Sequence, residues 1–341
     1  ISQREEIIKQ SNIISKSLEL KKSLVLNQDL ESILSSIMSN LDRVKGGYKG
    51  SPKFPIFNIY EVFLFFFNKT KKKDYLKVVE LILKQLCSQG IYDHVEGGIS
   101  RYTVDENWLI PHFEKMLYDN AQFVLLLSKY LKVEKNEYFE KKLIQTIDFV
   151  NKDFINAENG LLGSAYDADS EGEEGKYYIF SYKELKKIKD INQYFDVKPE
   201  GNWENKIILK EIKTPPKTAL LALKKLRKEK TKPFFDNKIQ LDLNCLWVSA
   251  LISAEQILPK NNFLKIAENY SKKLEFFFFN KEKLRHTLQK KEVFLEDYAY
   301  SIAMFLDLYD QTLKTNYLFK AREMCKKTIE LFYVKEKSIF Q

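Results

Sequence analysis

The chain has only three cysteines among its 341 residues. Cys87, Cys245 and Cys325 lie far apart and form no CxxC pair or other metal-ligand spacing. An odd, scattered set of thiols is typical of a reducing compartment, where each thiol behaves as a small apolar side chain. We therefore expect a cytoplasmic protein whose thiols are free and which has no redox activity of its own.

Arginine is scarce as well. Only six arginines occur among the 56 basic residues, which face 47 acidic ones for a net charge of +9. The lysines are dispersed between acidic residues, so they form no basic stripe, and no nucleic-acid-binding motif is present. We expect weak, purely electrostatic association with nucleic acid and no specific nucleic-acid partner.

Long apolar runs are also absent. No stretch approaches the ~18 residues of a membrane span, so no membrane partner is expected. The short runs Phe63–Phe67 and Phe276–Phe279 predict buried helix or strand. With 44% hydrophobic and 14% aromatic residues, the chain can bury a large core, which predicts one large domain and a short extra segment.

Apolar residues recur at helical spacing along most of the chain. Polar loops that contain glycine separate the helical segments, notably 44–55, 94–108 and 159–180. The loops predict a degenerate repeat of helical hairpins that close into a ring with the loops on one face; a linear solenoid is the alternative. The expected helices are Asp29–Leu41, Ile56–Asn68, Asp74–Ser88, Pro111–Leu131, Glu137–Ile155, Lys217–Glu229, Leu243–Leu258, Phe263–Leu274, Leu295–Thr312 and Tyr317–Phe332.

The segment Tyr92–Gln122, which we call the junction, holds two of the three histidines and many charged and aromatic residues. Pro111 predicts the first turn of a helix. His112 would then lie at a helix N-terminus, where the dipole favours a neutral imidazole, and would share a face with Lys115 and Asp119. We expect the functional pocket here; the alternative is a capped helix whose polar residues are solvated or bonded to neighbouring loops.

Five segments of this sequence, in order, resemble one known family. They are Gly46–Pro55, Tyr92–Ala121, Gly163–Phe180, Gly201–Trp203 and Phe294–Ala299. Together they resemble the thioredoxin-domain-containing family that includes the bacterial YyaL-type and spermatogenesis-associated proteins. The resemblance implies a thioredoxin-like domain followed by an all-α fold, an (α/α)6 toroid similar to six-hairpin glycosidases and N-acylglucosamine 2-epimerases. Short β-hairpins are expected in the loops.

The sequence departs from the family pattern in three places. The thioredoxin-like domain is missing, so residues 1–26 would be a connecting tail and the absent domain a partner in the full-length parent. Residues 27–341 would form the toroid, incomplete at its C-terminus because about ten helices are expected where a closed toroid needs about twelve. Leu243 and Cys245 stand where the family usually has Trp and Gly, whereas Asn244 is retained.

The resemblance directs attention to sugar chemistry. Glycoside hydrolysis needs two carboxyl groups across a pocket, whereas epimerisation needs proton-transfer bases, often histidine. The candidate catalytic residues are Asp93, His94, His112, Glu114, Asp167 and Asp169. The candidate substrate-binding residues are Tyr92, Arg101, Tyr102, Asp105, Trp108, Lys115, Asp119, Asn120, Asn244, Glu296, Asp297 and Tyr298.

No metal or cofactor is expected. Asp167 and Asp169 mimic the start of a calcium-binding EF-hand loop, but the twelfth position is Tyr178 and the flanking segment predicts a strand. This loop predicts a turn in which carboxylates cap backbone N–H groups, or reach sugar hydroxyls. His286 predicts an exposed or hydrogen-bonded histidine near the rim of the fold.

Three functions remain open on the sequence. The first is a cofactor-free sugar-processing enzyme, hydrolase or epimerase, that works through His94, His112 and paired carboxylates. The second is a noncatalytic toroid that binds a carbohydrate or a protein client beside a thioredoxin-like module. The third is a scaffold with a vestigial pocket. The dense polar loops favour a preserved pocket, but the sequence does not separate the first two functions.

Overall fold

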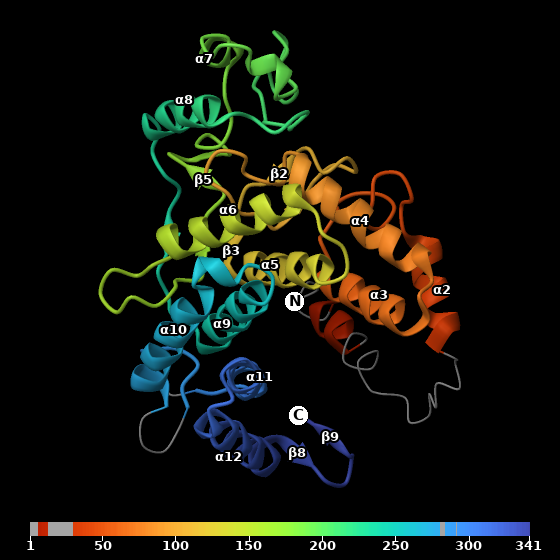
Figure 1. The fold of residues 1–341 in the computed structure, drawn as a ribbon, viewed down its shortest axis with the longest axis vertical. Coiled ribbons are helices and arrows are strands. Elements are labelled where there is room, and N and C mark those ends of the chain that lie inside the picture. Colours follow the sequence, from red (N-terminus) through yellow and green to blue (C-terminus); the bar gives the residue numbers. More distant parts are fainter. Residues whose placement is uncertain (1–5, 13–29, 280–283, 291) are drawn as a thin grey trace. The chain divides into compact units, whose positions relative to one another are not determined.

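The computed structural model describes residues 6–12, 30–279, 284–290 and 292–341 (Figure 1). The chain divides into unit 1, Ile1–Leu41, and unit 2, Asp42–Gln341. In unit 1, residues 6–12 are helical and α2 spans Leu30–Asn40. The rest of the expected connecting tail lies outside the described residues.

Unit 2 is built from helical hairpins in which consecutive helices pack against each other (Figure 1). The first helix of each pair also packs on the first helix of the following pair: α3 on α5, α5 on α9, and α9 on α11. This arrangement gives an inner layer of α3, α5, α9 and α11, as in an (α/α) toroid. The pairs are α3 (Phe57–Thr70) with α4 (Lys73–Ser88), α5 (Leu117–Leu131) with α6 (Glu137–Asp153), α9 (Leu241–Glu255) with α10 (Phe263–Phe278), and α11 (Leu295–Thr312) with α12 (Thr315–Phe332).

Side-chain burial explains why α9 lies in the inner layer and α4 does not. Every residue of α9 from Asn244 to Glu255 is buried, and most of them are apolar or small. A helix that is apolar on all sides is stable only when it is surrounded by other elements. In α4 the buried residues recur at helical spacing, from Tyr75 through Val79 to Leu86, and the opposite face carries lysines.

A chain of polar contacts joins the first turns of three inner helices. The Leu117 N–H donates to the Ser164 carbonyl at 2.9 Å, and Ser164 Oγ lies 2.7 Å from Gln240 Oε1. Gln240 Nε2 lies 3.0 Å from His286 Nε2, and His286 Nδ1 lies 3.0 Å from Asp297 Oδ1. Helices α5, α9 and α11 therefore begin at one end of unit 2. We call their first turns, with the loops that contact them, the N-terminal rim.

Two asparagines show that the hairpins are structural repeats. Asn120, the fourth residue of α5, accepts the Ile99 N–H at 2.9 Å and donates to the Ile99 carbonyl at 3.3 Å. Asn244, the fourth residue of α9, makes the same two bonds with Leu162, both at 2.9 Å. Each amide clamps the loop that precedes its helix, so the repeat predicted from the loops extends to single side chains.

Short antiparallel strands fasten the long loops to one another. Lys53 and Thr103 form a bridge between the first two loops, and the β3–β4 pairing joins the segment between the second loop and α5 to the third loop. The three loops therefore lie at one end of unit 2. The strands are β1 (Tyr102–Thr103) with β2 (Pro111–His112), β3 (Lys115–Met116) with β4 (Ala165–Tyr166) and β7 (Phe235–Asp236), β5 (Asp169–Ser170) with β6 (Glu173–Glu174), and β8 (Tyr333–Val334) with β9 (Ile339–Phe340).

The helix predicted to begin at Pro111 begins instead at Leu117. Pro111 belongs to β2, and the residues that follow form an extended loop and β3. The apolar side chain of Phe113 imitates helical spacing, but it stacks on Tyr178 of a distant loop, with ring centroids 5.5 Å apart. The other nine expected helices are present, with ends shifted by a few residues.

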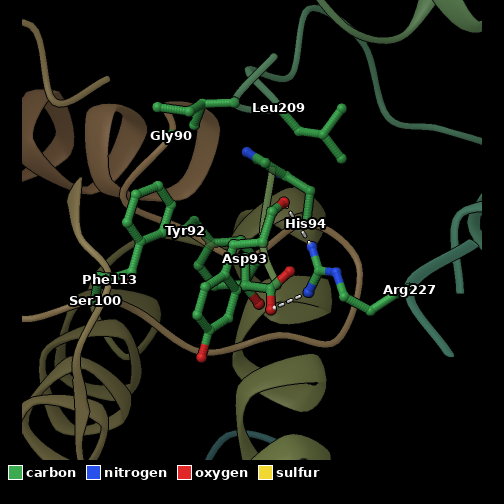
Figure 2. A pocket seen from close by; sticks show the side chains of 10 residues that line it. Gly90, Tyr92, Asp93, His94, Ser100, Phe113, Leu209 and Arg227 are labelled. Atoms are coloured by element: carbon green, nitrogen blue, oxygen red, sulfur yellow. Dashed lines mark hydrogen bonds and ion pairs between the residues drawn. The ribbon is translucent and has the colours of Figure 1, made fainter. Parts of the chain in front are cut away.

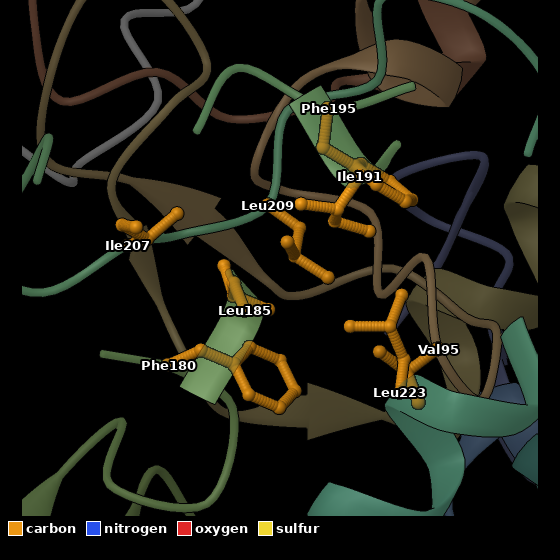
Figure 3. Packing of buried hydrophobic residues seen from close by; sticks show 8 residues of the cluster. All are labelled: Val95, Phe180, Leu185, Ile191, Phe195, Ile207, Leu209 and Leu223. Atoms are coloured by element: carbon orange, nitrogen blue, oxygen red, sulfur yellow. The ribbon is translucent and has the colours of Figure 1, made fainter. Parts of the chain in front are cut away.

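The segment between α6 and α9 makes a second, smaller core (Figure 3). It contains α7 (Tyr182–Leu185), the 3-10 helix η1 (Ile191–Gln193) and α8 (Lys217–Lys228), of which only α8 was predicted. This core fixes α8 and the preceding loop against the junction. Its buried residues are Val95, Phe180, Leu185, Ile191, Phe195, Ile207, Leu209 and Leu223.

Two features bear on the predictions from composition. Among the described residues, no helix combines the length and the apolar character that a membrane crossing requires. Cys87 and Cys245 are buried free thiols, and Cys325 is an exposed free thiol.

Candidate active site

The junction divides into a buried half and an exposed half. The side chains of Asp93 and His94 are 4% and 0% exposed, whereas those of Arg101 and His112 are 43% and 31% exposed. The buried side chains bond to other parts of the protein. The exposed ones surround the first turn of α5.

Asp93 holds together the loop in which it lies. Its Oδ1 accepts the Val95 N–H at 3.0 Å, and its Oδ2 pairs with Lys115 Nζ at 2.8 Å and with the Arg227 guanidinium at 2.9 Å. Burial alone would raise the pKa of Asp93, but Arg227 and Lys115 together hold it well below its usual range. Asp93 is thus an ionised carboxylate whose oxygen atoms are engaged within the protein.

The same arrangement occurs one hairpin earlier. Lys53 Nζ donates to the Gly46 carbonyl at 2.8 Å and lies 3.3 Å from Asp42 Oδ2. Lys115 likewise bonds both to Asp93 and to a glycine carbonyl of the junction loop. A contact repeated in two hairpins is explained by loop architecture. We therefore infer that Asp93 and Lys115 support the loop; we call this contact the aspartate latch.

His94 forms a second buried contact, with Lys142 and Glu211. The imidazole Nε2 lies 3.0 Å from the Gln89 carbonyl, and Nδ1 lies 3.1 Å from Glu211 Oε2. Lys142 Nζ lies 3.2 Å from Nδ1 and 2.8 Å from Glu211 Oε2. Burial and Lys142 lower the pKa of His94. Burial would raise the pKa of Glu211, but His94 and Lys142 lower it to about 2.

Asp93, His94 and Arg227 line a cavity within the buried half (Figure 2). Figure 2 shows the Arg227 guanidinium turned toward the Asp93 carboxylate. The cavity has a volume of about 20 Å³, which is room for about one water molecule. It cannot admit a sugar ring.

The other buried candidates also bond within the protein. Trp108 is fully buried, and its Nε1 donates to the Lys45 carbonyl at 2.9 Å. The Asp105 carboxylate accepts several backbone N–H groups of the β1–β2 loop, including that of Leu109. Tyr92 is 1% exposed. None of these side chains offers a face to a ligand, and Asn120 and Asn244 are the loop clamps described above.

The exposed half begins with three stacked rings. Phe54 and Tyr102 have centroids 4.6 Å apart at 24°, and Tyr102 and His112 have centroids 4.9 Å apart at 21°. The β1–β2 pairing places Tyr102 directly opposite His112. His112 therefore lies on a strand, and the predicted helix N-terminus and the helical face shared with Lys115 and Asp119 are wrong. Tyr102 is thus the middle ring of the stack, between Phe54 and His112.

Glu114 lies between Arg101 and His112. Its Oε2 is 3.0 Å from Arg101 NH1 and 4.0 Å from His112 Nε2. The hydrogen bond that Arg101 donates to Glu114 raises the pKa of Arg101. His112 Nδ1 lies 2.8 Å from Glu174 Oε1, on the β5–β6 hairpin. This hairpin turns through Glu171 and Gly172, both at positive φ, as a tight two-residue turn requires.

Asp119, the third residue of α5, has the opposite surroundings to Asp93. The residue is 6% exposed, and its Oδ2 is buried without a hydrogen-bond partner among the described residues. Burial raises the pKa of Asp119 well above 3.8; Arg101 opposes the rise and Glu114 adds to it. The rim therefore holds a carboxyl whose pKa is raised beside a carboxylate that is ion-paired.

The remaining candidates are spread over the rim and the core. Asp167 and Asp169 are exposed on the third loop, and the Asp167 carboxylate accepts a neighbouring backbone N–H. Glu296 is exposed in the first turn of α11. Asp297 is fully buried beside a histidine, and Tyr298 is buried against α12. The structure groups Arg101, Tyr102, His112, Glu114 and Asp119, all of them among the predicted site residues.

Several partners were missed because they come from distant segments. Lys142, Glu174, Glu211 and Arg227 meet the junction only through tertiary structure. Arg227 lies 134 residues after Asp93, on a helix with several other basic residues. One signal was available: in a chain with so few arginines, an arginine among apolar positions of an amphipathic helix is unusual.

No family model matches the sequence. An uncharacterised protein of Caenorhabditis elegans is 27% identical over 358 residues, covering 87% of this chain and 49% of that protein. Spermatogenesis-associated protein 20 of Rattus norvegicus is 26% identical, with 81% of this chain and 43% of that protein covered; the Homo sapiens protein is 25% identical, with 86% and 45% covered. The chain is a homologue of spermatogenesis-associated protein 20. It spans about half the length of these curated relatives.

Solved structures confirm the predicted fold class, the (α/α)6 toroid. A family 105 glycoside hydrolase of C. acetobutylicum has a TM-score of 0.55 at 17% identity, covering 91% of this chain and 73% of that one. A family 76 glycoside hydrolase from a bovine Bacteroides thetaiotaomicron strain has a TM-score of 0.56 at 11% identity, with 92% and 58% covered. An inactive alpha-1,6-mannanase variant of Salegentibacter, in complex with alpha-1,6-mannotetrose, has a TM-score of 0.51 at 11% identity, with 83% and 65% covered.

Proposed function

We propose that the N-terminal rim is the pocket of a sugar-processing enzyme of hydrolase type, with Asp119 as its proton donor. The observation that carries the proposal is the buried Oδ2 of Asp119, which has no partner within the described residues. Leaving a buried polar atom unsatisfied costs stability, so such an atom calls for an explanation. A carboxyl kept neutral by its surroundings is the form that general acid catalysis requires.

The rim supplies the second carboxyl group as well. In the proposed reaction Asp119 gives its proton to the glycosidic oxygen as the bond to the anomeric carbon breaks. Water adds its oxygen to that carbon, and Glu114, held by Arg101, accepts the proton that the water loses. The overall change is hydrolysis, with an acid and a base in different protonation states as glycoside hydrolysis demands.

Two observations favour hydrolysis over epimerisation. His94, one of the two expected histidine bases, is buried and bonded to Gln89 and Lys142. His112, the other, has its Nδ1 engaged by Glu174 and its ring stacked on Tyr102. The likeness in fold to glycoside hydrolases, one of them holding an oligosaccharide, supports a carbohydrate ligand.

The test compares two kinds of substrate. The 341-residue chain is incubated with alpha-1,6-linked manno-oligosaccharides and with a panel of 4-nitrophenyl glycosides, and released sugar is measured. Asp119→Asn should lower turnover of an unactivated oligosaccharide by about 10²- to 10⁴-fold, the usual contribution of an acid–base group. The loss should be much smaller for a nitrophenyl glycoside, because nitrophenolate leaves without protonation. A merely structural role for Asp119 would reduce both alike.

Asp148→Asn is the matched control. Burial raises the pKa of Asp148 also, but this residue lies on the outer helix α6, where Lys224 opposes the shift. Its turnover should equal that of the unmodified chain. If sugars raise the melting temperature but none is cleaved, the result favours the noncatalytic alternative. In that alternative the toroid binds carbohydrate and works beside a thioredoxin-like module in the full-length parent.

A further inference from the structure

Three metal-ligating side chains meet at the first turns of α9 and α11. His286 Nδ1 lies 3.0 Å from Asp297 Oδ1 and 3.9 Å from Asp242 Oδ1, and the three ligand atoms all lie within 4.8 Å of one another. The sequence predicted no metal site, and an exposed or hydrogen-bonded histidine at position 286. The group was not predictable because His286 meets α9 only in the fold, where the Leu241 N–H donates to the His286 carbonyl at 2.9 Å.

We propose that Asp242, His286 and Asp297 bind a divalent transition-metal ion, with Zn²⁺ as the best match. Zinc takes imidazole nitrogen and carboxylate oxygen at about 2.0–2.2 Å, so tetrahedral ligand atoms stand roughly 3.3–3.6 Å apart. His286 Nδ1 is 3.0 Å from Asp297 Oδ1, just below this range, and 3.9 Å from Asp242 Oδ1, just above it. Three protein ligands leave a fourth position open to water or to a substrate oxygen.

Asp242 provides the first independent support. Its Oδ1 is buried and has no hydrogen-bond partner among the described residues, although it points toward His286. A proton on His286 Nδ1 would serve Asp297, at 3.0 Å, and leave Asp242 Oδ1 without a partner. A metal ion would satisfy both carboxylates and the imidazole together.

The second support comes from the residues behind His286. Ser164 Oγ has one hydrogen but faces two acceptors, the Lys238 carbonyl and Gln240 Oε1, each at 2.7 Å. If the Gln240 amide is reversed, its nitrogen donates to Ser164 Oγ, and the serine donates to Lys238 alone. The amide oxygen then faces His286 Nε2, 3.0 Å away, and accepts its N–H.

With the Gln240 amide in this orientation, the hydrogen of the neutral His286 imidazole lies on Nε2. With the hydrogen on Nε2, the lone pair of the neutral imidazole is on Nδ1, directed at the two carboxylates. An imidazole lone pair and an ionised carboxylate oxygen 3.0 Å apart repel each other, and a cation bound between them would remove this repulsion. Metal-bound histidines commonly donate their other N–H to a protein oxygen in this way. Gln240 would thus orient the metal ligand.

Charge and access define the class of ion. One imidazole and two carboxylates suit Zn²⁺ and similar first-row ions, whereas Mg²⁺ and Ca²⁺ prefer sites made wholly of oxygen. The side chains of His286 and Asp242 are 19% and 14% exposed, so an ion can enter from solvent, and Asp297 is fully buried behind them. The site uses none of the residues assigned to sugar hydrolysis.

The test is calorimetric titration of the chelator-treated 341-residue chain with ZnCl₂, and with MgCl₂ and CaCl₂ as controls. One equivalent of zinc should bind, with little heat from the other two ions. His286→Gln and Asp242→Asn should each weaken zinc binding at least roughly 100-fold, and Gln240→Ala roughly 10- to 100-fold. His112→Gln is the matched histidine control and should bind zinc as the unmodified chain does.

The wild-type chain gives a second measurement, independent of whether any variant folds. Co²⁺ added to it should produce visible absorption bands of a nitrogen- and oxygen-ligated ion, and zinc should abolish them. Absence of these bands, or zinc binding that survives His286→Gln but is lost in His112→Gln, would overturn the proposal. Because the readouts are heat and absorption, they are independent of whether the rim cleaves sugars.

Discussion

Asp93 and Asp119 are two aspartates of one junction, both buried, with opposite surroundings. Asp93 meets two cations and the backbone N–H groups of Val95 and Glu96, and its pKa is held well below the usual range. Asp119 has a buried oxygen without a partner within the described residues, and burial raises its pKa. Burial alone therefore does not identify a functional carboxyl. The number of its oxygen atoms that the protein satisfies is the better guide.

Asp297 sharpens the comparison. It is the third residue of α11, as Asp119 is the third residue of α5. The Asp297 carboxylate accepts the Phe294 N–H at 2.9 Å and so stabilises the start of its helix. Asp119 occupies the equivalent place, but its Oδ2 has no hydrogen-bond partner among the described residues. That missing bond distinguishes Asp119 from Asp297.

The largest stability effect is expected at the aspartate latch. Asp93→Asn keeps an oxygen for the Val95 N–H but removes the nearest counter-charge of the buried cations Lys115 and Arg227, leaving Arg227 only the Glu96 carboxylate at 3.7 Å. Removing one partner of a buried ion pair costs about 3–5 kcal/mol. Urea denaturation should show a loss of this size.

The control for the latch is an exposed ion pair. Asp74→Asn removes the partner of Lys77, and both side chains are more than two-thirds exposed. Such pairs contribute about 0–1 kcal/mol. If Asp93→Asn cost no more than Asp74→Asn, the latch would not be structural, and Asp93 would return as a candidate for catalysis.

A substitution at Asp119 is expected to increase stability, whereas the substitution at Asp93 lowers it. Asp119→Asn removes a buried carboxyl with an unpartnered oxygen and should stabilise the chain at neutral pH by about 1–3 kcal/mol. Asp310→Asn, at an exposed position of α11, should change stability by less than about 0.5 kcal/mol. The measurement is the free energy of unfolding at pH 7.

The pH dependence follows from the raised pKa of Asp119. Below 3.8 the carboxyl is protonated in both the folded and the unfolded state, so it has no effect on stability. As the pH rises above 3.8, the unfolded chain loses this proton first, and the folded state becomes less stable relative to it. The advantage of Asp119→Asn should therefore be small near pH 3 and larger at neutral pH. An advantage that is largest in acid would contradict the assignment.

His94 is expected to have a smaller effect on stability. It lowers stability as the pH falls, whereas Asp119 lowers stability as the pH rises. Burial and Lys142 lower the pKa of His94, so the unfolded chain binds more protons as the pH falls through 6.5, and stability falls. The slope has an upper limit of about 1.4 kcal/mol per pH unit. His94→Gln should flatten the stability curve between pH 7.5 and 5.5. In that window Glu211, with a folded pKa of about 2, contributes little. An unchanged slope would show that His94 is not held neutral.

These contrasts show what the sequence could and could not predict. The helices with one apolar stripe or an apolar surface were predictable, because their periodicity is local. The start of α5 was not, because Phe113 follows the helical pattern while packing against a distant ring. The rim residues Glu114 and Asp119 lie within one short segment, so composition alone drew attention to them.

The roles of the same residues were beyond the sequence. Whether an aspartate is ionised or protonated depends on partners such as Arg227, which is 134 residues away. The Asp242–His286–Asp297 group has no recognisable spacing either, because it forms where two hairpins meet. Local patterns therefore indicate where polar residues gather, and long-range packing decides which of them are satisfied.

The smallest stability effect is expected at the rim ion pair. Arg101 and Glu114 are 43% and 25% exposed at their side chains, so solvent screens their attraction. Arg101→Met keeps much of the aliphatic stem and should cost about 0–1 kcal/mol of unfolding free energy. It should nevertheless slow oligosaccharide turnover, because Glu114 loses the group that positions it. A loss of several kcal/mol, comparable to that of Asp93→Asn, would instead make the rim a second structural latch. A small loss of stability with a large loss of turnover is the result that separates a site from a scaffold.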